Sequence, residues 1–159
     1  MAKRKTRIGI VTGGGDCPGL NAVIRGAVHR LLRHHDAEVF GSEDAYNGLL
    51  EDPPRVRRLD FAAIRDILTK GGTILGTTNR GDPYQYPQRG SDGRVQLVDN
   101  SKKLKQRIDE HGLDGIISIG GDGSLGLAKR LMDDHGIPMI GVPKTIDNDV
   151  PGTDYTFGF

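Results

Sequence analysis

Cysteine and aromatic residues are scarce in this chain of 159 residues. Cys17 is the only cysteine, so no disulfide can form within the chain, which favours a reducing compartment such as the cytoplasm. Aromatic residues make up 5% and tryptophan is absent, yet hydrophobic residues reach 35% and fall in short, separated runs. A chain of this length and composition is expected to fold as one globular domain around an apolar core.

Long apolar runs and an excess of one charge are also missing. The 22 lysines and arginines nearly balance the 21 aspartates and glutamates, and the net charge is +1. Nucleic-acid binding usually needs a strongly basic face, so we expect no nucleic-acid partner. The basic start leads only into the short apolar run 8–11, and no run is long enough to span a bilayer. We therefore expect neither a signal peptide nor a membrane partner.

Glycine, in contrast, is abundant, with 24 residues. Its clusters follow short apolar segments rather than being scattered along the chain. Glycine at such a place lets the backbone adopt positive φ and lets N–H groups come close to a ligand. The clusters therefore indicate where binding loops lie.

The hydrophobic pattern predicts alternating strands and helices. Strands are predicted at residues 7–12, 38–41, 56–59, 113–119 and 137–142. Helices are predicted at 20–32, at 60–68 with Asp60 as N-cap, at 101–111 with Ser101 as cap, and after Ser124 as far as Met132. Residues 47–48 are assigned to a loop, and residues 76–93, rich in Gly, Pro, Asp and Arg, to a long irregular loop.

This alternation predicts an α/β fold, a doubly wound and mostly parallel sheet with helices on both faces. Ligands bind such sheets beyond the carboxyl ends of the strands. Three conspicuous loops follow strands, after Thr12, Ile119 and Val142. We expect them to gather at one edge of the sheet.

The first loop is Gly13-Gly14-Gly15-Asp16, followed by a helix. Bare backbone amides and a positive helix end suit a phosphate group. The run matches neither G-x-G-x-x-G nor the Walker pattern, so the usual mononucleotide loops are not supported. The alternative is a tight turn without a ligand.

The second loop contains Gly120, Gly121, Asp122, Gly123 and Ser124. A carboxylate between glycines at a strand end can reach a magnesium ion while the amides hold nucleotide phosphates. The alternative is that Asp122 only caps the helix that follows.

The third loop holds two carboxylates, Asp147 and Asp149, after Lys144. Strand-like alternation would point the two carboxylates the same way, with one as a base and the other as its electrostatic neighbour. Lys144 could neutralise a phosphate oxygen as a point charge. A solvated Asx-rich turn is the alternative reading.

Taken together, four motifs resemble the 6-phosphofructokinase family in order and spacing, over essentially the whole chain. They are Gly14-Gly15-Asp16-Cys-Pro-Gly-Leu-Asn21, Gly71-Gly72-Thr-Ile-Leu-Gly76, Ile119-Gly-Gly-Asp-Gly-Ser124 and Pro143-Lys-Thr-Ile-Asp-Asn-Asp149, with Gly152-Thr-Asp-Tyr-Thr-Phe-Gly158 behind them. The resemblance implies transfer of a terminal phosphoryl group to the 1-hydroxyl of fructose 6-phosphate, with Mg²⁺, in glycolysis. Other kinases with a Gly-Gly-Asp-Gly turn, such as NAD or lipid kinases, lack the Thr-Ile-Asp-Asn-Asp loop.

The resemblance also implies roles for individual residues. Asp147 would be the base, supported by Asp149, and Asp122 would hold the metal. The donor would be bound by Gly15, Gly121, Asp122, Gly123, Ser124 and Lys144, and the sugar phosphate by Thr145, Ile146 and Asp147, with Thr145 also in the catalytic set.

Two positions depart from many bacterial members. Where those members have an Arg-Phe pair, this chain has Asn79 and Arg80, both assigned to the donor site. Arg80 is expected to neutralise the transferring phosphate from a shifted position. His29 stands where the ATP-inhibited, ADP-activated bacterial type has an arginine, which argues against that allosteric site.

Two further positions bear on the donor. Pyrophosphate-using relatives tend to have Asp at the position of Gly123, and a small residue there resembles the ATP users. Lys144 is shared with pyrophosphate enzymes and with one ATP-using subgroup. ATP is therefore the expected donor, and pyrophosphate is the alternative.

The family continues with a second α/β region that grips fructose 6-phosphate. Residues 1–159 are therefore expected to be the N-terminal donor-binding and catalytic domain, with the second domain absent from this chain. The isolated chain would then be poorly active, or a silent nucleotide- or phosphate-binding fragment. The resemblance further implies a cytoplasmic enzyme that is a homo-oligomer, a tetramer, when full length.

Overall fold

Five strands form the main sheet in the computed structural model, which describes residues 4–159. Their order across the sheet is β3-β2-β1-β6-β7. All neighbours are parallel except β3, which runs antiparallel to β2. The strands are β1 (Arg7–Thr12), β2 (Glu38–Ser42), β3 (Val56–Arg58), β6 (Gly115–Gly120) and β7 (Met139–Pro143). The predicted mostly parallel α/β fold is confirmed.

The central strand β1 is buried on both of its faces. Ile10 and Val11 follow one another and are 0% and 2% exposed. Because successive strand residues point to opposite faces, Ile10 packs in one core and Val11 in the other. Near-continuous apolar character is typical of a parallel strand covered on both sides.

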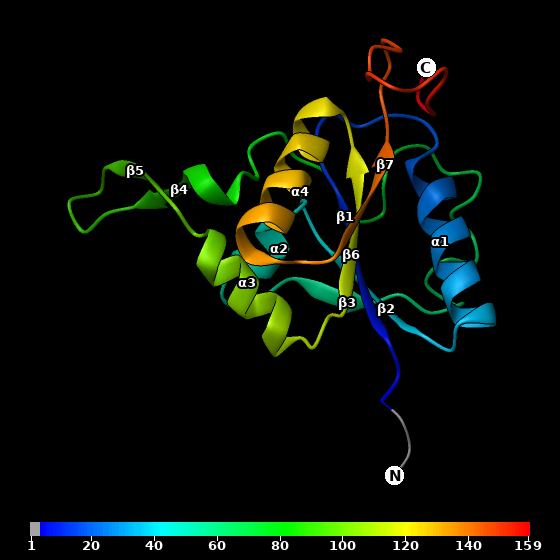
Figure 1. The fold of residues 1–159 in the computed structure, drawn as a ribbon, viewed down its shortest axis with the longest axis horizontal. Coiled ribbons are helices and arrows are strands. Elements are labelled where there is room, and N and C mark those ends of the chain that lie inside the picture. Colours follow the sequence, from blue (N-terminus) through cyan, green and yellow to red (C-terminus); the bar gives the residue numbers. More distant parts are fainter. Residues whose placement is uncertain (1–3) are drawn as a thin grey trace.

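Helices cover both faces of the sheet, which is seen nearly edge-on in Figure 1. On one side lies α1 (Leu20–His34), whose Leu20, Ile24 and Val28 are buried against the sheet. The other side is covered by α2 (Asn47–Leu50), α3 (Ser101–Glu110) and α4 (Asp122–His135). No helix in the described part of the chain has the length and apolar character needed to cross a membrane.

The helix predicted at residues 60–68 is wrong. Asp60 does begin a turn, accepting a hydrogen bond from the Ala63 amide at 2.9 Å, but the segment continues as successive turns. It has one i−4 bond, from the Ile64 amide to the Asp60 carbonyl, and one i−3 bond, from the Arg65 amide to the Ala62 carbonyl, so no regular ladder forms. Ile64 and Ile67, spaced by three residues, are buried in the same core as α1, and this packing replaces the helix.

Two predicted loops also contain regular structure. Residues 47–50 form the short helix α2 rather than a loop. Residues 76–93 include the 3₁₀ turn η1 (Pro83–Gln85) and β4 (Tyr86–Arg89), which pairs with β5 (Val95–Val98). The resulting hairpin projects from the body of the molecule beside α3 (Figure 1). The predicted cap is also wrong, since Asn100 is the N-cap of α3 and Asp99 accepts from the Ser101 amide.

Candidate functional site

Two adjoining cavities lie at the carboxyl edge of the sheet, where the loops after β1, β6 and β7 meet. We call the larger one, about 380 Å³, the glycine-loop cavity, because Gly13–Gly15, Gly121 and Gly123 line it. The smaller one, about 340 Å³, is the carboxylate cavity, lined by Asp16, Asp122, Asp147 and Asp149. The predicted gathering of the three loops at one edge is confirmed.

Glycine is required where the β1 and β6 loops touch. A Cβ atom on Gly120 would lie 2.5 Å from the Ser124 Cβ, and one on Gly13 would lie 2.8 Å from the Ser124 Oγ. Gly14 has φ +83, a left-handed conformation that favours glycine. The close approach of the two loops leaves their backbone facing the glycine-loop cavity.

Asn21 links the first loop to the Gly71-Gly72-Thr73-Ile74 motif. Its side chain is buried and donates to the carbonyls of Lys70 and Gly71 at 3.1 and 3.2 Å. Its Oδ1 accepts from the Ile74 amide at 2.7 Å. These three hydrogen bonds hold the second motif against the start of α1.

Lys144 stands between the two cavities and lines both. The residue is 6% exposed, and its Nζ donates to the Gly15 carbonyl at 2.6 Å. No ion pair of residues 4–159 includes this ammonium, although a buried charge is normally paired. The positive charge is therefore available to an anion in either cavity. Burial raises the pKa of the nearby Cys17 thiol, with Lys144 acting in the opposite direction, so Cys17 is not an activated nucleophile.

The carboxylates of the third loop are organised by Thr145. Its hydroxyl donates to Asp149 Oδ1 at 2.7 Å and accepts from the Asp147 amide at 3.0 Å. Both carboxylates line the carboxylate cavity, but not by strand alternation, since Asn148 has φ 52 and the segment turns there. The predicted strand-like alternation is wrong, although both carboxylates reach the same cavity. Asp147 is exposed to solvent in the cavity and can reach a ligand.

Asp122 opens α4, with Gly121 as N-cap and no side-chain capping bond. The alternative of a simple helix cap is therefore not what the structure shows. Its carboxylate faces the same cavity as Asp147 and Asp149, an all-oxygen donor set that fits Mg²⁺. Within residues 4–159 no three His, Cys, Asp or Glu side chains are grouped closely enough to hold a metal alone. One carboxylate completed by ligand phosphates and water is the usual magnesium arrangement.

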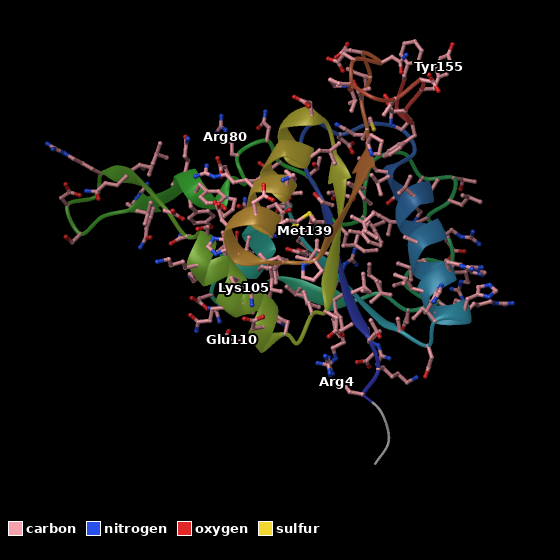
Figure 2. The ribbon with its side chains drawn as sticks, viewed as in Figure 1. Arg4, Arg80, Lys105, Glu110, Met139 and Tyr155 are labelled. Carbon is pink, nitrogen blue, oxygen red and sulfur yellow. The ribbon has the colours of Figure 1, made fainter. Side chains whose placement is uncertain are left out.

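Of the remaining residues predicted from the resemblance, three line a cavity and Arg80 does not. Asn79 and Ser124 line the glycine-loop cavity, and Ile146 lines the carboxylate cavity. Arg80 lines neither cavity. It is exposed on the loop beside α4, as Figure 2 shows, and its amide donates to Thr78 Oγ1 at 3.0 Å.

Several lining residues were not predicted from the sequence. Ala45 and Tyr46 lie in the turn after β2, and Asp82 lies just before η1. The others lie on regular elements: Val11 on β1, Ser118 on β6 and Leu127 on α4. Burial raises the pKa of Tyr46 to about 12, so this phenol stays neutral. The available signal was positional, because β2 is another parallel strand and its carboxyl end reaches the same edge.

The fold and these two cavities define an α/β protein with two adjoining cavities at the carboxyl edge of a mostly parallel sheet. Phosphoryl transfer in particular needs amide and cationic groups at a donor and a carboxylate near an acceptor. The chain belongs to the phosphofructokinase family, whose model matches residues 7–159.

Relatives with either donor are similar to this chain. The ATP-dependent 6-phosphofructokinase 1 of Synechocystis is 46% identical over 96% of this chain and 41% of its own length. The pyrophosphate–fructose 6-phosphate 1-phosphotransferase of Amycolatopsis mediterranei is 48% identical over 96% of this chain and 40% of its own. The chain therefore spans about two fifths of the curated relatives it matches.

A solved structure shares the architecture. Phosphofructokinase from Pichia pastoris in the T-state has a TM-score of 0.78 and 29% identity, covering 99% of this chain and 17% of that one. The predicted phosphofructokinase fold is confirmed by this likeness.

Proposed function

We propose that this chain is the donor-binding and catalytic part of an ATP-dependent 6-phosphofructokinase. The reaction transfers the terminal phosphoryl group of ATP to the 1-hydroxyl of fructose 6-phosphate and yields fructose 1,6-bisphosphate and ADP. The observation that carries the proposal is the pair of adjoining cavities that share Gly15, Gly121 and Lys144. One cavity offers amides and a cation, and the other offers carboxylates, in keeping with a donor and an acceptor side by side.

The size and lining of the glycine-loop cavity favour ATP over pyrophosphate. At about 380 Å³, it falls in the range of small-molecule sites and extends well beyond the two glycine loops. Tyr46 and Leu127 give its inner part the apolar and aromatic character that suits a nucleoside. A Cβ on Gly123 would meet nothing within 4 Å, so a larger residue there would project into open space that ATP needs.

In the proposed mechanism, Asp147 accepts the proton of the 1-hydroxyl as that oxygen attacks the terminal phosphorus. The new O–P bond forms as the bond to the ADP oxygen breaks. Lys144 neutralises charge on the phosphoryl group, and Asp149 holds Thr145 in place beside Asp147. Asp122 would hold Mg²⁺, which supplies charge neutralisation on the donor phosphates when bound. We assign the neutralising charge to Lys144 in preference to Arg80, because Lys144 lines both cavities and Arg80 lines neither.

The remaining expectations belong to the same proposal. The sugar phosphate would meet Thr145 and Ile146, and its remaining contacts would come from a second domain. The complete enzyme would be a cytoplasmic homo-oligomer. The alternative is a chain that binds a nucleotide or phosphate without catalysing transfer.

Calorimetric titration of the 159-residue chain with Mg-ATP, Mg-pyrophosphate and fructose 6-phosphate tests the proposal. We expect Mg-ATP to bind more tightly than Mg-pyrophosphate, and fructose 6-phosphate to bind weakly. Tighter binding of pyrophosphate would reverse the assignment of the donor. If none of the three ligands binds, a phosphoryl-transfer role for this site is rejected.

Gly123→Asp sharpens the test of the donor. The added carboxylate would enter the glycine-loop cavity and repel the donor phosphates, so we expect the ATP affinity to fall at least about tenfold. Gly126→Ala is the matched control, because Gly126 lies on the same helix, has no atom within 4 Å of its Cβ position and lines neither cavity. Equal ATP affinity in the two variants would remove Gly123 from the donor site.

A further inference from the structure

One wall of the glycine-loop cavity is a short segment without regular structure, from Thr78 to Asp82. Its beginning is fixed to the first glycine loop. The Gly14 amide donates to the Thr78 carbonyl at 3.0 Å, and Thr77 Oγ1 donates to the Gly14 carbonyl at 2.7 Å. We call residues 78–82 the cavity wall.

The end of the cavity wall is fixed by Tyr84. The Tyr84 amide donates to Asp82 Oδ1 at 2.8 Å, which ties the last wall residue to η1. The Tyr84 side chain then reaches α4, where its hydroxyl donates to Asp134 Oδ2 at 2.8 Å. The wall is thereby joined to a helix 50 residues further along the chain.

The aromatic ring of Tyr84 is held as well as its hydroxyl. The Arg130 guanidinium lies 3.6 Å from the ring centroid, and the His135 ring stacks at 6.2 Å with an interplanar angle of 24°. Arg130 and Asp134 also form an ion pair at 3.4 Å, so the two groups that hold Tyr84 orient each other. A cation over an aromatic face is an attractive contact of defined geometry.

The same helix forms the facing side of the cavity. The first turn of α4 contributes Gly123 and Ser124 to the lining, and its last two turns carry Arg130, Asp134 and His135. One helix therefore lines one side of the cavity directly and contacts the segment of the other side through Tyr84.

We propose that Tyr84 is a positioning residue that holds the cavity wall against α4 and so sets the width of the glycine-loop cavity. Its effect on donor affinity rests on the proposed function, whereas its hold on the wall does not. Pyrophosphate would occupy only the end of the cavity between Gly15 and Lys144, so the wall matters for the nucleoside part of ATP. Tyr84 therefore acts on the choice of donor without touching the phosphates.

Three variants in the 159-residue chain test this role. Tyr84→Ala removes the ring and the hydroxyl, and Tyr84→Phe removes only the bond to Asp134. Arg130→Gln removes the stacked cation together with its ion pair to Asp134. Tyr155→Ala is the control, because Tyr155 is 78% exposed on the C-terminal segment and lines neither cavity (Figure 2). Each variant is titrated with Mg-ATP and with Mg-pyrophosphate, and backbone amide exchange is followed by NMR.

For Tyr84→Ala we expect the dissociation constant for Mg-ATP to rise about 5- to 20-fold, while that for Mg-pyrophosphate changes less than about twofold. A general loss of stability would weaken the binding of both donors, so it would not produce this difference between Mg-ATP and Mg-pyrophosphate. Tyr84→Phe is expected to recover most of the ATP affinity, and Tyr155→Ala to match the parent chain. Equal losses for both donors, or no loss of ATP affinity, would overturn the proposal.

Amide exchange tests the role of Tyr84 independently of the proposed ATP-dependent function. The amides of Arg80, Tyr84 and Gln85 are hydrogen-bonded, so they report whether the wall is held. Faster exchange at these amides in Tyr84→Ala, without faster exchange in the sheet, supports the role of Tyr84 even in a chain that binds no ATP. Unchanged exchange at these amides would overturn it. If Tyr84→Ala does not fold, Arg130→Gln decides by the same two measurements.

Discussion

At the scale of single residues, the proposed function divides the chemistry between the carboxylate of Asp147 and the ammonium of Lys144. Asp147 is exposed in its cavity and its amide is fixed by Thr145, so the side chain can approach a ligand while its backbone stays in place. Lys144 is buried and fixed to Gly15. Positioned groups of opposite charge on adjoining cavities suit a reaction that depends on alignment and charge neutralisation.

Asp147→Asn tests the role of the base in a full-length phosphofructokinase that carries this sequence as its N-terminal part. Asparagine keeps the size of the side chain but cannot accept a proton, so kcat is expected to fall by about 10²- to 10⁴-fold with little change in KM. Steady-state kinetics measure both constants. Arg80→Ala serves as the comparison, because Arg80 lies outside both cavities and its loss should be much smaller. A larger effect of Arg80→Ala would restore Arg80 as the catalytic cation.

Single residues were predicted well where a motif carried them and poorly where only tertiary structure did. Gly15, Asp122 and Asp147 belong to loops that follow strands, so their shared edge followed from the rule for parallel sheets. Tyr46 reaches the cavity through a turn with left-handed Asp44 and Ala45, at φ 50 and 60, which no local pattern predicts. The position of Arg80 depends on the course of a loop whose hairpin was not predicted either.

At the scale of elements, the end of β6 requires glycine at Gly120, whereas the interior of α4 only tolerates it at Gly126. Gly120→Ala would place Cβ 2.5 Å from the Ser124 Cβ and 3.0 Å from the Gly13 carbonyl oxygen. The two loops must then move apart, and we expect the free energy of unfolding to fall by about 1–3 kcal/mol. Urea denaturation measures the change.

The matched variant on α4, the helix that follows β6, should change the free energy of unfolding in the opposite direction. Gly126 lies inside α4 with open space at its Cβ position, so Gly126→Ala is expected to raise the free energy of unfolding by about 0.5–1 kcal/mol. Similar destabilisation by both substitutions would mean that the contact at Gly120 is not the cause.

The elements themselves were predictable where periodicity was strong. Strand β1 and helix α1 have long apolar patterns, and both lie where the pattern placed them. Residues 60–68 show why a helical pattern can be misleading, since two isoleucines three residues apart also satisfy a chain of turns packed on α1. The hairpin β4–β5 packs few of its residues, so its sequence carries little hydrophobic signal.

At the scale of the whole molecule, β7 forms one edge of the sheet and is not covered along its outer side. Ile140 is 67% exposed on this strand, which carries no charged residue. Exposed apolar edge strands promote association with other chains. Ile140→Lys is therefore expected to lower the light scattering of concentrated solutions while the thermal midpoint stays nearly unchanged.

Met132→Lys provides the comparison for that experiment. Met132 is 39% exposed on the helix α4 and not on a strand, and the substitution adds the same charge. If both variants reduce scattering equally, net charge is the cause and the edge of β7 is not.

The position of Lys144 has a consequence for how two ligands influence each other. One ammonium faces both cavities, so an anion bound in either of them uses the same positive charge. Two phosphate-bearing ligands that compete for it should show negative cooperativity, each weakening the other by one common factor, as thermodynamic reciprocity demands. A ligand pair in which only one partner carries phosphate near Lys144 should bind independently.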